Sequence, residues 1–129
     1  MTDLNCYVTT FNCGRTLIDV DHFAANFFNG LTTNLPPDLV VLALEEIAPI
    51  GYSFLGGSYL APYFTRLTTA IHVAASRRFE RENEYESVIV RNVGMTAIML
   101  FARNSIQEQI RWIETAGVGV GVWDMGNKG

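Results

Sequence analysis

Residues 4–12 read Leu-Asn-Cys-Tyr-Val-Thr-Thr-Phe-Asn, and residues 39–44 read Leu-Val-Val-Leu-Ala-Leu. The first stretch is rich in β-branched and aromatic residues and the second is a short continuous apolar run, so both predict strands. A connection of 25 residues, 13–37, separates them. A crossover of this length favours two parallel strands in one sheet, whose carboxyl ends then lie at the same edge.

Two helices are expected around these strands. In the crossover, Asp21 is the expected N-cap, residues 22–29 carry apolar side chains at helical spacing, and Gly30 is expected to end the helix. A longer amphipathic helix is predicted over residues 59–79, where apolar residues recur at steps of three to five.

The rest of the chain predicts further strands. Residues 85–91 and 95–102 fit a hairpin around residues 92–94, and residues 110–123 fit another strand. A sheet with helices packed against it places the chain in the α/β class.

The composition fits one modest domain with much apolar surface to bury. The 129 residues are 49% apolar and 17% charged, with a net charge of −4, whereas soluble domains carry about 25% charged residues. Disordered chains have the opposite composition. Because nine basic residues face thirteen acidic ones, a basic nucleic-acid or anionic-membrane module is disfavoured. One explanation for the apolar surplus is that the chain is part of a larger core.

Three further features bear on the cellular compartment. Residues 47–65 carry no charge, yet Pro49 and Pro62 argue against a membrane-spanning helix, so we expect a buried or partner-facing loop. Cys6 and Cys13 have opposite strand parity, which disfavours a disulfide and predicts buried free thiols in a reducing compartment. The first residues contain no secretory signal pattern.

Asn12 and Glu46 each follow one of the two predicted parallel strands, so both are expected at the shared edge. Amide and carboxylate oxygens are ligands that Mg²⁺ accepts while keeping several waters. Glu45 precedes Glu46, and in an extended chain only one of the two can face the site. Spacing alone favours the alternative, in which Asn12 starts a turn with Gly14 and both glutamates are solvated.

Other motifs give weaker signals. The glycines near the end do not fit a phosphate-binding loop, because the lysine is one residue late and the hydroxyl is missing. His22 and His72 lie in predicted helices without a second ligand nearby and are expected at the surface. Lys128, the only lysine, lies in Gly-Asn-Lys-Gly at residues 126–129, where a tight turn is the expectation.

Three motifs occur in order along the chain. They are Thr-Phe-Asn-Cys-Gly at residues 10–14, Pro-Asp-Leu-Val-Val-Leu-Ala-Leu-Glu-Glu-Ile at 37–47, and Gly-Asn-Lys-Gly at 126–129. This ordered set resembles the inositol polyphosphate 5-phosphatases of the endonuclease/exonuclease/phosphatase superfamily, and residues 93–103 resemble the strand between the second and third motifs. The resemblance implies the N-terminal half of a two-sheet α/β sandwich of the DNase I-like fold. Residues 1–129 would be the N-terminal part of one such domain.

The resemblance also implies a chemistry. It suggests Mg²⁺-dependent phosphomonoester hydrolysis of inositol polyphosphates or phosphoinositides, with Asn12 and Glu46 as catalytic and metal-binding residues. Asn127 and Lys128 would bind substrate. Glu45 stands where these enzymes usually have glutamine. Their water-activating and phosphate-binding residues lie in later motifs, so residues 1–129 alone are expected to be inactive and poorly soluble.

Two other functions stay open at this point. One is a nuclease of the same superfamily, which the net charge of −4 disfavours because a nuclease must neutralise many phosphates. The other is a non-catalytic fragment. The expected partners are the substrate, the missing C-terminal half of the domain and lipid head groups contacted peripherally, but no nucleic acid. The expected location is cytoplasmic.

Overall fold

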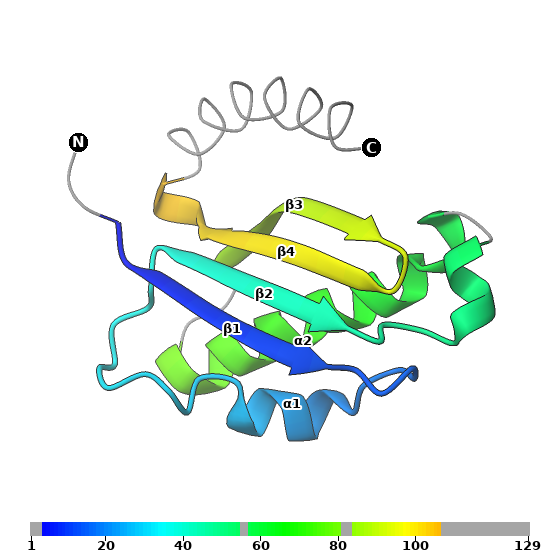
Figure 1. Cartoon of the computed structure of the whole chain (residues 1–129). Helices are drawn as coiled ribbons and strands as arrows, with labels where there is room; N and C mark the ends of the chain where they lie inside the picture. The colour runs from blue at the N-terminus through cyan, green and yellow to red at the C-terminus, as the bar shows by residue number, and fades with distance from the viewer. Residues whose placement is uncertain (1–3, 55–56, 81–83, 107–129) are drawn as a thin grey trace.

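The computed structural model describes residues 4–54, 57–80 and 84–106. These residues form one four-stranded sheet with two helices on the same face (Figure 1), which confirms the α/β class. The strands are β1 (Cys6–Asn12), β2 (Leu39–Glu45), β3 (Tyr85–Val93) and β4 (Thr96–Arg103). The helices are α1 (Val20–Asn26) and α2 (Ala61–Phe79), with short 3-10 helices η1 (Ile50–Phe54), η2 (Gly57–Tyr59) and η3 (Asn104–Ile106).

The sheet has the strand order β1-β2-β4-β3. β1 and β2 pair in parallel, as the crossover predicts, from Cys6 opposite Leu39 to Asn12 opposite Glu45. β4 joins β2 and β3 in antiparallel pairs, and the β3–β4 hairpin turns at Gly94, whose φ is 59°. The parallel pair therefore brings the ends of β1 and β2 together at one edge.

The core lies between the sheet and the two helices. In β2, Val40, Leu42 and Leu44 are buried at alternate positions against the helices, because strand side chains alternate between faces. The opposite face carries side chains such as Val8 of β1 and Ile98 of β4, which are 63% and 45% exposed. One face of the sheet is thus fully packed and the other still presents apolar surface.

The start and end of α1 differ from the sequence-based expectation. The N-cap is Asp19, not Asp21, because Asp19 has an extended backbone and its carboxylate accepts the N–H of His22 at 3.1 Å. Asp21 lies in the first turn and pairs with Arg77 of α2. The helix ends at Asn26, before Gly30. A Cβ on Gly30 would lie 3.1 Å from the Tyr7 hydroxyl, so this glycine permits close packing against β1.

The other elements follow the sequence closely, with one correction. The long helix and the hairpin are confirmed, whereas the strand predicted over residues 110–123 lies outside the described residues. Cys6 and Cys13 are both free, but only Cys13 is buried. Cys6 is exposed because β1 is an edge strand and its even-numbered side chains point to the open face. No helix among the described residues is long and apolar enough to cross a membrane.

Candidate metal and phosphate site

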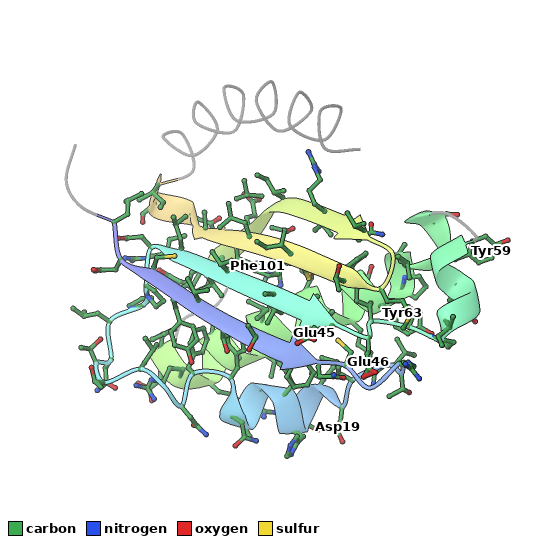
Figure 2. The ribbon with its side chains drawn as sticks, in the orientation of Figure 1. Asp19, Glu45, Glu46, Tyr59, Tyr63 and Phe101 are labelled. Atoms are coloured by element: carbon green, nitrogen blue, oxygen red, sulfur yellow. The ribbon has the colours of Figure 1, made fainter. Side chains whose placement is uncertain are left out.

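The turns that follow β1 and β2 are hydrogen-bonded to each other. The Cys13 N–H donates to the Glu45 carbonyl at 2.9 Å, and the Arg15 N–H donates to the Glu46 carbonyl at 2.7 Å. Figure 2 shows Glu45 and Glu46 at the carboxyl end of β2, beside the end of β1. The predicted meeting of the two strand ends is confirmed, and we call this region the carboxyl edge.

Asn12 ends β1 and starts a tight turn. Its Oδ1 accepts the Gly14 N–H at 2.8 Å, and Gly14 has a φ of 66°, which a residue with a side chain rarely adopts. The turn expected from the spacing is thus present. An amide oxygen has two lone pairs, so this hydrogen bond leaves Asn12 able to contact a cation.

The two adjacent glutamates differ in position. Glu45 is the last residue of β2, lies directly opposite Asn12 in the strand register and is exposed. Glu46 follows the strand, has a φ of 49°, and pairs with Arg15 at 3.3 Å between Nη2 and Oε1. The expectation that both glutamates are solvated holds for Glu45, whereas Glu46 is partly buried and paired with Arg15. Asn12, Glu45 and Glu46 share one edge, with Glu45 as the register neighbour of Asn12.

The donor chemistry of the carboxyl edge fits a hard divalent cation. Mg²⁺ is usually held by one or two carboxylates and keeps several waters, and this edge offers two carboxylates and an amide oxygen. Within residues 4–54, 57–80 and 84–106 no group of three or more His, Cys, Asp or Glu side chains forms a complete metal cluster. The edge is therefore a partial ligand set that suits Mg²⁺ by its chemistry.

Cys13 lies next to Asn12 but does not belong to the ligand set. Its side chain is buried, and burial raises the pKa of the thiol to about 11. A thiol with this pKa stays protonated near neutral pH, whereas metal ligation and nucleophilic attack both need the thiolate. Cys13 is a packing residue beneath the turn.

Sequence reasoning missed Arg15. Its position directly after Asn12-Cys13-Gly14 is the only signal in the sequence, and its contact with Glu46 depends on how the two turns fold. His22 and His72 are exposed helix residues, as expected. Asn127 and Lys128, the expected substrate-binding residues, lie outside the described residues.

Comparison with known proteins defines the class to which this fold and edge belong. The model of the endonuclease/exonuclease/phosphatase family 2 matches residues 9–129, so the chain belongs to that family. No curated protein sequence matches the chain.

Among solved structures, the chain is similar to the inositol polyphosphate 5-phosphatase domain of SPsynaptojanin in complex with inositol (1,4)-bisphosphate and a calcium ion. The identity is 13% and the TM-score 0.62, over 81% of this chain and 29% of that chain. Cimex nitrophorin matches with a TM-score of 0.48 at 10% identity, over 79% of this chain and 31% of that one. The match to the 5-phosphatase domain and to the family model shows the DNase I-like fold expected from the motifs. The chain spans less than a third of each of these two structures.

Proposed function

We propose that this chain is the N-terminal, cation-binding part of a Mg²⁺-dependent phosphomonoesterase that acts on inositol polyphosphates or phosphoinositides. The observation that carries the proposal is the carboxyl edge, where Asn12, Glu45 and Glu46 lie together in a chain of this family. The resemblance of the third motif, with Asn127 and Lys128 as substrate-binding residues, favours the phosphatase branch.

Two residues of the edge have proposed roles. Glu46 is the principal metal ligand, and Asn12 lies beside both the cation and the scissile phosphate. When bound, Mg²⁺ would polarise a phosphoryl oxygen and stabilise the charge that develops during attack by water. The hydrogen-bonded turns hold the backbones that carry these two side chains next to each other, through contacts at 2.7 to 2.9 Å.

The remaining half of the domain is the proposed partner of the open sheet face. Val8 and Ile98 leave apolar surface on that face, and burying such surface is what drives two layers together. Groups that activate water and bind the phosphate would come from that half. Cytoplasmic location and peripheral contact with lipid head groups belong to the same proposal, because phosphoinositides are membrane lipids.

The experiment uses the full-length protein that contains these residues. Phosphate release from a 5-phosphorylated inositol is measured with Mg²⁺ and with a chelator, and cleavage of plasmid DNA is measured in parallel. We expect Mg²⁺-dependent phosphate release and no DNA cleavage. DNA cleavage without phosphate release would identify a nuclease, and neither activity in the folded protein would leave the non-catalytic alternative.

A further inference from the structure

Arg15 and Glu46, which contact each other at the carboxyl edge, both have a positive backbone φ. Among the described residues, the non-glycine positions with positive φ are Arg15 at 63°, Glu46 at 49° and Glu80 at 55°. Glu80 is explained by its place at the end of α2, where a left-handed residue closes the helix and its N–H bonds to the Ser76 carbonyl. Arg15 and Glu46 end no helix, and they contact each other through both backbone and side chain.

The stability of the ion pair does not explain this geometry. The side chains of Arg15 and Glu46 are 51% and 39% exposed, and exposed pairs contribute little to stability. Left-handed conformations of non-glycine residues carry an energetic cost and cluster at functional sites. The edge therefore maintains a strained pair in which an arginine contacts a proposed metal ligand.

Two other arginines of the described chain have different surroundings. Arg78 donates to the carbonyls of Leu31 and Thr33, and Arg103 lies partly buried between two carboxylates. Arg15 offers one long contact to Glu46, and about half of its side chain is open to solvent. Because a guanidinium has five N–H donors in a planar fork, most of the donors of Arg15 are available to an incoming anion.

We propose that Arg15 is an oxyanion-binding residue of the carboxyl edge, whose guanidinium receives a phosphoryl oxygen of the substrate when Glu46 ligates the cation. This inference rests on the proposed function and adds a residue to its site. A cation on Glu46 neutralises the carboxylate that holds Arg15, so the guanidinium then pairs best with the phosphate. Without phosphate, Arg15 and the cation compete for Glu46. With phosphate, they act on the same anion.

The competition predicts opposite changes in two affinities, both measured on the full-length protein that contains these residues. Mn²⁺ affinity is measured by electron paramagnetic resonance without phosphate, and inorganic phosphate affinity is measured by calorimetry with Mg²⁺. For Arg15→Ala we expect Mn²⁺ to bind about threefold more tightly, because a weak competing ion pair is lost. Phosphate should bind about tenfold more weakly, because a charge-assisted hydrogen bond is lost. Arg15→Lys should fall between, since lysine keeps the charge without the fork.

Arg77→Ala is the matched control. Arg77 is 52% exposed and pairs with Asp21 at 2.7 Å, but this pair joins α1 and α2 and not the strand ends. We expect it to leave both affinities unchanged. Circular dichroism and the thermal midpoint verify that each variant folds as the wild type does.

Three results would overturn the inference. They are no phosphate binding by the wild type with Mg²⁺, unchanged phosphate affinity in Arg15→Ala, and a joint fall of both affinities with the thermal midpoint, which is the mark of a purely structural residue. The proposed function and the role of Arg15 can fail separately. If Glu46→Gln removes Mn²⁺ binding while Arg15→Ala changes nothing, the proposed function stands and the role of Arg15 is wrong.

Discussion

Each end of the sheet carries an arginine paired with carboxylates, and the two ends are built differently. At the carboxyl edge, Arg15 and Glu46 are 51% and 39% exposed and 3.3 Å apart. At the opposite end, the side chains of Arg103, Glu84 and Asp38 are 14% to 23% exposed. Arg103 Nε donates to Glu84 at 2.6 Å, and its Nη1 lies 3.7 Å from Asp38.

The opposite end also ties the strands together through the backbone. Asp38 accepts the Asn5 N–H at 2.9 Å with its carboxylate and the Arg103 N–H at 3.0 Å with its carbonyl. The buried Tyr85 hydroxyl donates to the Pro37 carbonyl. Hydrogen bonds and ion pairs between these residues therefore join all four strands at this end of the sheet. One end therefore stabilises the sheet, whereas the other carries exposed charges and two residues in a left-handed backbone conformation.

The largest expected effect concerns the two glutamates of the carboxyl edge. In the full-length protein, Glu46→Gln should lower turnover by about 10²–10³-fold, because the cation that stabilises the developing negative charge is held less tightly. Glu45→Gln should lower turnover much less. Steady-state phosphate release measures both variants. Since Glu45 is the register neighbour of Asn12, equal effects, or a larger one for Glu45→Gln, would contradict the assignment of Glu46 as principal ligand.

The next effect concerns the opposite end. Arg103→Met should lower the free energy of unfolding by about 3 kcal/mol, because it leaves two partly buried carboxylates without their partner. Arg15→Met is the control and should change it by less than about 1 kcal/mol. Urea denaturation measures both. A smaller loss for Arg103→Met than for Arg15→Met would reverse the proposed division between the two ends.

These two ends were not equally predictable. The parallel strands and their shared edge follow from the apolar runs and from the length of the crossover, so Asn12, Glu45 and Glu46 could be placed together from sequence alone. The Arg103 network could not, because it depends on the register of β3 and β4 with β2.

Local chemistry limited the prediction elsewhere. Asp19 and Asp21 are both suitable N-caps by residue type, and the backbone entering α1 decides between them. Arg15 was missed because a left-handed turn at a non-glycine residue leaves no clear pattern in the sequence. The expectation of a buried Cys6 failed because strand order, which makes β1 an edge strand, is not readable from residue types.

A smaller effect is expected at the turn that holds Asn12. Gly14→Ala should destabilise the protein by about 1 kcal/mol, because its φ of 66° is unfavourable for alanine. No atom lies within 4 Å of the added Cβ, so the cost comes from the backbone and not from a clash. Gly51→Ala, which also meets open space and has no positive φ, is the control. Equal urea midpoints for the two variants would show that the turn is not strained.

The smallest effect is a pH dependence from Cys13. Burial raises the pKa of its thiol to about 11, so the folded state holds the proton more tightly than the unfolded state does. The resulting stability is complete below the ordinary thiol pKa and is lost as the pH rises toward the folded value. The loss at pH 9.5 should be no more than about 1 kcal/mol. Urea denaturation of the wild type and of Cys13→Ala, each at about pH 7 and at about pH 9.5, isolates this contribution. A loss of the same size in Cys13→Ala would assign it to other groups.

The most direct test of the central claim is a residue-resolved titration with Mg²⁺ of the full-length protein that contains these residues, followed by amide chemical shifts in nuclear magnetic resonance spectra. We predict saturable shifts at Asn12, Gly14 and Glu46, and unchanged resonances around Arg103 at the opposite end of the sheet. Glu46→Gln should abolish the shifts, while Glu86→Gln, an exposed position on β3, should retain them. Saturable shifts around Arg103, or shifts at the carboxyl edge that persist in Glu46→Gln, would contradict the assignment of this edge as the cation site.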